Sequence, residues 1–92
     1  MIRKKFVIKA KYGVHMRPAV RIYDAIKDFR SKVEIKKDDN VVDARSTLGL
    51  IILNILPGDT IEVIANGIDE QQVIDKLTDL IENKKLGEDD DD

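Results

Sequence analysis

Apolar residues in this 92-residue chain follow two alternating periods, and the alternation restricts the folds open to it. In some segments they occupy every second position, which is typical of a strand with one buried face. In others they recur at every third or fourth position, which is typical of an amphipathic helix. In chain order the periods predict strand, helix, strand, strand, short helix, strand and helix. One-faced strands have to be covered, so the helices should lie on the apolar face of one antiparallel sheet.

Turn and capping residues separate these segments. Strands are expected at residues 2–9, 32–37, 41–44 and 60–65, and helices at residues 16–29, 45–56 and 69–85. Asp69, followed by Gln72, resembles a capping box at the start of the last helix. Residues 45–56 are apolar nearly all round, so a buried strand is an alternative there. Ser46 as an N-cap and Pro57–Gly58 as a stop favour the helix.

The expected fold class is α+β, with two layers: a four-stranded antiparallel sheet covered on one face by three helices, in the order β-α-β-β-α-β-α. Residues 1–86 should form this one domain. Residues 87–92 begin with Gly87 and continue with five acidic residues, so we expect an acidic disordered tail there. Without the tail the chain is only mildly basic, which is too weak a charge for nucleic-acid binding.

Composition excludes several kinds of chemistry. The chain has no cysteine and one histidine, so neither a disulfide nor a metal site is expected, and no motif indicates a cofactor. No apolar run approaches the ~18 residues of a membrane span, so no membrane insertion is expected. The charged N-terminus is not followed by the long apolar segment of a signal peptide. We therefore expect a cytoplasmic protein.

The single histidine, His15, stands where the first helical pattern begins. Pro18 fits the first turn of a helix, which places His15 at or next to the cap. The backbone amides of Met16 and Arg17 would then point at a group carried by His15, and the Arg17 guanidinium could bind phosphoryl oxygens. A neutral imidazole is a competent nucleophile near pH 7. The alternative is a loop histidine beside a solvated arginine, and spacing alone favours that simpler interpretation.

Ser46 and the apolar residues after it form a second candidate site. Ser46 should cap the short helix, while Leu48, Ile51 and Ile52 could form an exposed docking patch. A phosphate on Ser46 would place about two negative charges beside that patch and weaken docking. The alternative is that the whole apolar stripe belongs to the core.

Both sites carry a family resemblance. Residues 13–19, with the sequence Gly-Val-His-Met-Arg-Pro-Ala, resemble the active-site signature of HPr, the histidine-containing phosphocarrier family of the bacterial phosphotransferase system. Residues 45–50 resemble the second signature of that family, which contains a regulatory serine, and residues 57–63 look like the start of its fourth strand. The resemblance covers residues 1–86 and implies an open-faced β-sandwich.

The resemblance implies a phosphocarrier and not an enzyme. His15 would accept a phosphoryl group from phosphorylated enzyme I and pass it to enzyme IIA domains for sugar uptake, with Arg17 steadying the group. Ser46 would be the target of the HPr kinase/phosphorylase in lineages that have one. The carrier would act as a monomer. Because His15 is present, the chain is not the paralogue of this family that lost its histidine. The implied docking face consists of Val20, Lys27, Thr47, Leu48, Gly49, Ile51 and Ile52.

Four residues depart from the usual pattern of the family. They are Tyr12, Met16, Asp24 and Thr47. Residues 43–46 look somewhat like those of a nitrogen-related branch, so a purely regulatory phosphocarrier is the second hypothesis. A third hypothesis, from a different class, is an interaction module whose apolar patch binds a partner and whose histidine is silent.

Overall fold

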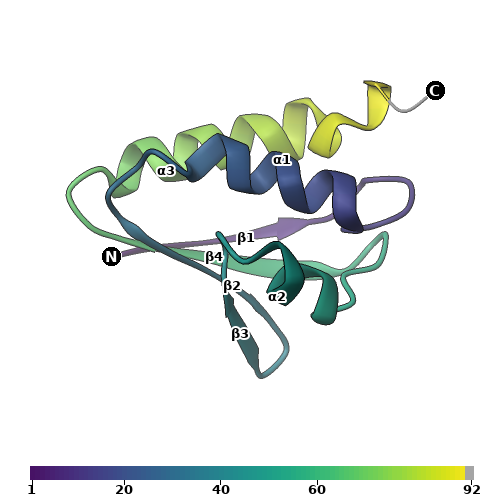
Figure 1. The fold of residues 1–92 in the computed structure, drawn as a ribbon, viewed down its shortest axis with the longest axis horizontal. Coiled ribbons are helices and arrows are strands. Elements are labelled where there is room, and N and C mark those ends of the chain that lie inside the picture. Colours follow the sequence, from purple (N-terminus) through teal and green to yellow (C-terminus); the bar gives the residue numbers. More distant parts are fainter. Residues whose placement is uncertain (91–92) are drawn as a thin grey trace.

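The computed structural model describes residues 1–90, without the side chains of 88–90, and shows the expected order of elements (Figure 1). The strands are β1 (Ile2–Val7), β2 (Lys32–Lys37), β3 (Asn40–Asp43) and β4 (Thr60–Asn66). The helices are α1 (Met16–Ile26), α2 (Thr47–Ile52) and α3 (Glu70–Thr78), and α3 is followed by a π-helical turn (Asp79–Asn83) and a 3-10 segment (Lys85–Asp90). Of the predicted acidic tail, residues 91–92 lie outside the described residues, as do the side chains of residues 88–90.

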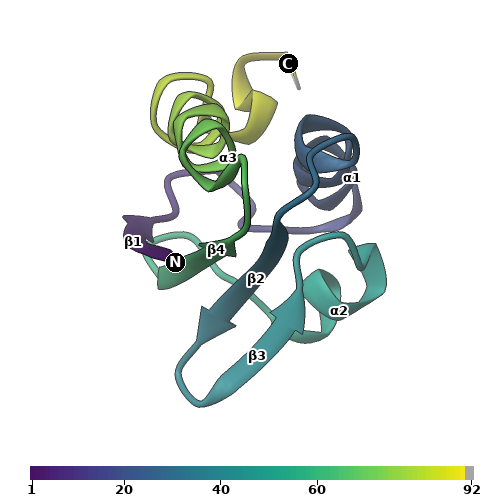
Figure 2. The ribbon, with the colours of Figure 1, turned by 90° about the vertical axis from the view of Figure 1, so that its left-hand side faces the viewer.

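The sheet has the strand order β1-β4-β2-β3, and all its neighbouring strands are antiparallel. Register pairs Phe6 with Ile61 and Ile35 with Val63, so their side chains point to the same face. Helices α1 and α3 lie side by side over that face, while α2 packs against the end of β3 and against α1 (Figure 2). Among residues 1–90, no helix lies on the other face of the sheet. The predicted α+β class, with helices on one face only, is therefore confirmed.

The core lies between the sheet and the helices. Its fully buried side chains come from both layers and from the apolar stripes that the sequence predicts, and they include Ile22, Ile26, Ile35, Leu50, Ile61, Val63, Val73, Leu77 and Ile81. Burying each such side chain stabilises the fold by roughly 1.5–3 kcal/mol. Leu86 is also buried, and after it Gly87 packs against the side chain of Arg21. The body of the domain therefore continues to the first residue of the predicted tail.

The first helix ends three residues before the predicted boundary. Its α-helical segment stops at Ile26, and a turn follows in which the amide of Phe29 donates to the Ile26 carbonyl. The Arg45 guanidinium donates to the carbonyls of Ile26, Phe29 and Ser31 at 3.0, 2.6 and 3.1 Å. A side chain remote in sequence thus satisfies the carbonyl groups at this helix end, which local periodicity does not encode.

Substitution of Arg45 tests this cap. We expect Arg45→Met to lower the free energy of unfolding by about 2 kcal/mol, because it leaves part-buried carbonyls without a charged donor. Urea denaturation measures the loss. Arg3→Met is the matched control. Arg3 forms an exposed ion pair with Glu62, and its replacement should cost under about 1 kcal/mol. Equal losses in the two variants would contradict the capping role.

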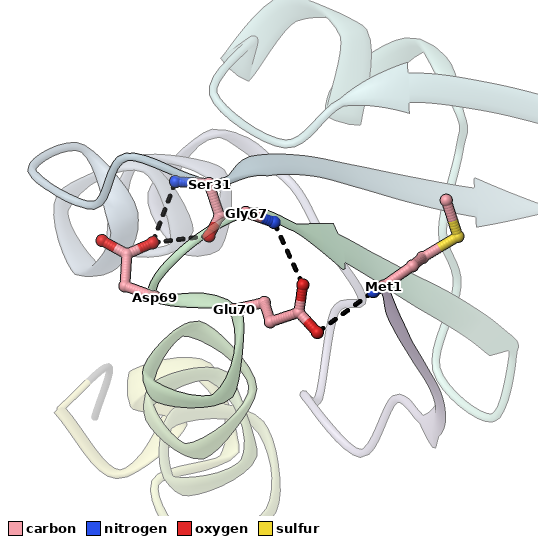
Figure 3. Close-up of polar contacts among 5 residues, drawn as sticks. All are labelled: Met1, Ser31, Gly67, Asp69 and Glu70. Carbon is pink, nitrogen blue, oxygen red and sulfur yellow. Dashed lines mark hydrogen bonds and ion pairs between the residues drawn. The ribbon is translucent and has the colours of Figure 1, made fainter.

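Asp69 is the N-cap of α3, as predicted, but the predicted capping box is wrong. The side chain of Asp69 makes no cap hydrogen bond to its own helix. It accepts hydrogen bonds from the amide and the hydroxyl of Ser31 (Figure 3) and also from the amide of Arg30. Glu70 instead reaches back to the Gly67 amide at 3.1 Å and to the N-terminal ammonium of Met1 at 3.1 Å. Asp69 therefore joins the loop before α3 to the loop after α1.

These bonds make Asp69 a source of pH-dependent stability. The Arg30 amide, followed by the Ser31 hydroxyl, holds the pKa of Asp69 below its ordinary value. The folded state therefore binds this proton more weakly than the unfolded chain, and the stabilisation is present at neutral pH and is lost as the pH falls below about 4. Asp69→Asn should lower stability at pH 7 and flatten its acid dependence in urea titrations. Asp28→Asn, at an exposed position, is the control for the loss of one carboxylate and should leave stability at pH 7 unchanged.

Candidate functional site

His15 caps the N-terminus of α1. Its backbone is extended, with φ −95° and ψ −164°, and its carbonyl accepts the first helical hydrogen bond, from Ala19, at 3.0 Å. The imidazole makes no capping hydrogen bond and is exposed. The predicted place of His15 at the mouth of the helix is confirmed. Its ring therefore does not hold the helix end and is accessible from solvent.

The first turn of α1 supplies hydrogen-bond donors beside His15. Met16 and Arg17 follow the cap directly, and amides of a first turn point out of the helix, along a dipole that carries roughly half a positive charge. Pro18, next in the turn, has no N–H and is buried. Donors and positive potential at one point suit the binding of a phosphoryl group.

The loop before His15 is anchored to the segment that follows α2. The Val14 amide donates to the Ile55 carbonyl at 2.9 Å, and the Gly13 amide donates to Ala10 at 3.0 Å. Gly13 has φ +72°, and a Cβ atom placed on it would lie 2.2 Å from the Ile55 oxygen. Only glycine fits there. The loop that carries His15 is thus tied to the segment after α2, and α1 packs against α2. No spacing in the sequence reveals this link.

Ser46 is the N-cap of α2, as predicted. Its hydroxyl oxygen accepts a hydrogen bond from the Gly49 amide at 3.0 Å. Residues Thr47–Ile52 are helical, so the alternative of a buried strand is wrong. The same hydrogen bond brings Gly49 close to the Ser46 side chain, and both residues are half-buried.

The expected docking residues divide into exposed and half-buried groups. Leu48 and Ile52 are 66% and 71% exposed, whereas Leu50 between them is fully buried, so the interpretation of the whole stripe as core is wrong. Val20 is 39% exposed on α1. Thr47, Gly49 and Ile51 are half-buried, and Ile51 packs against the core.

Charged and aromatic residues complete this surface. Lys27 is exposed and lies 3.9 Å from Asp24, one of the four departures from the family pattern. The ring of Tyr12, another departure, lies edge-to-face against the His15 imidazole. The sequence identifies Tyr12 only as a departure from the family pattern and does not predict this contact. The sole signal it offers is its place three residues before the histidine.

The part of the chain that the structure describes contains neither a metal-binding cluster nor a helix that could span a membrane. Among those residues, no cluster of three His, Cys, Asp or Glu side chains could hold a metal ion. None of their helices combines the length and apolar character that crossing a membrane requires.

An α+β domain that exposes one histidine at the mouth of a helix has the architecture of a phosphoryl-group carrier, and comparisons with known proteins agree. The family model described as "PTS HPr component phosphorylation site" matches residues 2–83. The HPr-like protein Crh of Halalkalibacterium halodurans is 37% identical, over 91% of this chain and 100% of that protein.

Solved structures give the same result. HPr-C-His from Thermoanaerobacter tengcongensis matches with a TM-score of 0.89 and 34% identity, over 95% of this chain and 97% of that chain. A Crh structure from Bacillus subtilis, described as a dimer with a swapping domain, matches with a TM-score of 0.69 and 32% identity, over 96% and 95% of the two chains. The chain belongs to the HPr family of the phosphotransferase system, whose members are phosphocarriers and not enzymes.

Proposed function

We propose that this protein accepts a phosphoryl group on His15 from phosphorylated enzyme I and passes it to enzyme IIA domains in the cytoplasm, for sugar uptake. The observation that carries the proposal is the exposed imidazole at the cap of α1, with the first-turn amides of Met16 and Arg17 beside it. No cofactor or metal takes part. Family membership supports the same place in a phosphotransfer chain.

The chemistry needs few groups. The unprotonated nitrogen of the neutral imidazole forms a bond to phosphorus while the donor's bond to phosphorus breaks and the donor keeps the electron pair. Charge on the phosphoryl oxygens is met by the first-turn amides and by the Arg17 guanidinium. Phosphoryl transfer depends mainly on positioning and electrostatic stabilisation, so no further catalytic group is required. The same bond to nitrogen remains labile, which lets the group move on to the next protein.

Partners would dock on the apolar surface around His15. Val20 on α1 and Leu48 and Ile52 on α2 are exposed, and α1 packs against α2, so one partner surface can cover all three. Lys27 adds a positive charge at the edge of this area. Together with the half-buried Thr47, Gly49 and Ile51, these residues would form the docking face.

Incubation with enzyme I and phosphoenolpyruvate tests the proposal. The protein should acquire a phosphate that is labile in acid and stable in alkali, as expected of phosphohistidine. Transfer onward to a sugar-specific enzyme IIA supports the transport role; transfer only to a nitrogen-branch enzyme IIA would replace it with the regulatory alternative. If no label forms, the carrier hypothesis fails, and an interaction module with a silent histidine becomes the better interpretation.

Ser46 would regulate docking. A phosphate there would lie two residues from the exposed Leu48, at the start of the helix that carries most of the proposed docking face. We expect Ser46→Asp to weaken binding to enzyme I about fivefold by calorimetry, a charge effect comparable to that of other interface charges. Ser46→Ala removes the hydroxyl and its cap hydrogen bond without adding charge and is the control. Identical affinities for the two variants would reject this regulatory role.

The proposal includes a monomeric carrier. The described residues bury a complete core within one chain, with the edge strand β1 paired to β4. The similarity to a Crh structure with a swapping domain makes the oligomeric state worth measuring. Sedimentation at micromolar concentrations should give the mass of one chain; a stable dimer would contradict this part of the proposal.

A further inference from the structure

Tyr12 lies beside the only histidine of the chain. The centroids of the Tyr12 and His15 rings are 6.3 Å apart, and the ring planes are inclined by 69°, which is the edge-to-face arrangement favoured by aromatic pairs. The ammonium of Lys11 lies 5.4 Å from the centroid of the same tyrosine ring. We propose that Tyr12 is a positioning residue for phosphotransfer, which holds the His15 imidazole in the orientation that accepts the phosphoryl group.

The backbone fixes where the Tyr12 ring can lie. The hydrogen bond from Gly13 to Ala10 closes a tight turn around Lys11 and Tyr12. Ala10 and Val14, which flank this turn, are buried, and the Val14 amide also donates a hydrogen bond to the Ile55 carbonyl. Tyr12 therefore projects from a short loop that is anchored at both ends, even though its side chain is 66% exposed.

The His15 ring needs such a neighbour because no capping bond holds it. Its side chain makes no hydrogen bond to the helix end and is exposed, so the backbone alone leaves the ring free to rotate about its side-chain torsions. Only part of that range points a ring nitrogen toward a phosphoryl group bound at the Met16 and Arg17 amides. An edge-to-face contact with Tyr12 restricts the side-chain torsions of His15. It thereby raises the fraction of molecules in which a ring nitrogen faces the phosphoryl group.

A small phosphoryl donor separates positioning from docking. Phosphoramidate has no surface to dock, and His15 is the only histidine it can modify. In this reaction the P–N bond of phosphoramidate breaks, ammonia leaves with the electron pair, the new bond forms to a nitrogen of His15, and the second ring nitrogen releases its proton to solvent. We expect Tyr12→Ser to slow this reaction about threefold, the scale set by the strength of aromatic pairs.

Two further variants sharpen the test. Tyr12→Phe retains the ring and should react at the wild-type rate. Tyr23→Ser removes an exposed tyrosine farther along α1 and should also leave the rate unchanged. In the unphosphorylated proteins, the proton NMR signals of the His15 ring should move in Tyr12→Ser, through loss of the tyrosine ring current, and move much less in the other two variants.

The outcomes are distinct. A wild-type rate for Tyr12→Ser with phosphoramidate, or an equal loss in Tyr23→Ser, would overturn the proposal. Slowing of the enzyme I reaction alone would also overturn it, because that pattern assigns Tyr12 to docking. The inference rests on the proposed phosphocarrier function, yet the phosphoramidate and NMR measurements do not use enzyme I. Failure of enzyme I to label the wild-type protein would therefore count against the proposed function, whereas the phosphoramidate and NMR results would still decide whether Tyr12 positions His15.

Discussion

Replacement of His15 by alanine is expected to abolish labelling by enzyme I and phosphoenolpyruvate completely. The chain contains no other histidine and no cysteine, so no second nucleophile of comparable character can take over the group. The imidazole is exposed and makes no cap hydrogen bond, so the variant should keep the wild-type free energy of unfolding within about 0.5 kcal/mol. Transfer of radioactive phosphate, followed by an acid-lability assay, measures the first effect, and urea denaturation measures the second.

Loss of labelling is informative only if docking survives. Calorimetry of His15→Ala with enzyme I should show binding close to that of the wild-type protein, because the exposed apolar side chains of Leu48 and Ile52 are unchanged. Binding that vanishes together with labelling would mean that His15 serves the interface rather than the chemistry. Labelling that persists in the variant would place the acceptor on another residue and refute the proposed function.

The architecture of this domain could be predicted because its sequence patterns are local. The change from period two to period 3.6 marks the strands and the two long helices, and it places Ile61 and Val63 in the core together with Leu77. The short helix α2 is apolar nearly all round, and capping and turn residues indicated it instead. His15 could be placed at a helix cap because a proline is tolerated in the first turn of a helix and not in its interior, so the helix has to begin just before Pro18. Physical reasoning on the residues alone did not decide whether His15 is functional; the resemblance of two separate motifs to one family did.

Tertiary contacts account for what could not be predicted. Arg45 ends α1 by capping its carbonyls from 16 or more positions away, and no periodic pattern records such a bond. Asp69 has the local signature of a helix cap, yet its oxygens bind Arg30 and Ser31 because those amides lie within reach in the folded chain. At the site, the contact between Tyr12 and His15 depends on the tight loop that they share.

The Gly13→Ala substitution should show how strongly the histidine loop depends on that geometry. Gly13 has φ +72°, which costs a residue with a side chain about 1 kcal/mol or more. An added Cβ would also lie 2.2 Å from the Ile55 oxygen, so the loop or the segment after α2 has to move. We expect the free energy of unfolding to fall by about 3 kcal/mol. At temperatures where the variant is folded, phosphorylation of His15 should also be slower, because the loop that carries it is displaced.

Gly58 provides the matched control for this substitution. It has φ +88°, the same left-handed region, but nothing lies within 4 Å of the position that a Cβ would take. Gly58→Ala should therefore lose only about 1 kcal/mol and leave phosphorylation unchanged. The difference between the two variants isolates the contact with Ile55 from backbone strain. If both variants lose the same stability and label at the same rate, the close approach of Gly13 to Ile55 does not position His15, and the two sites act independently.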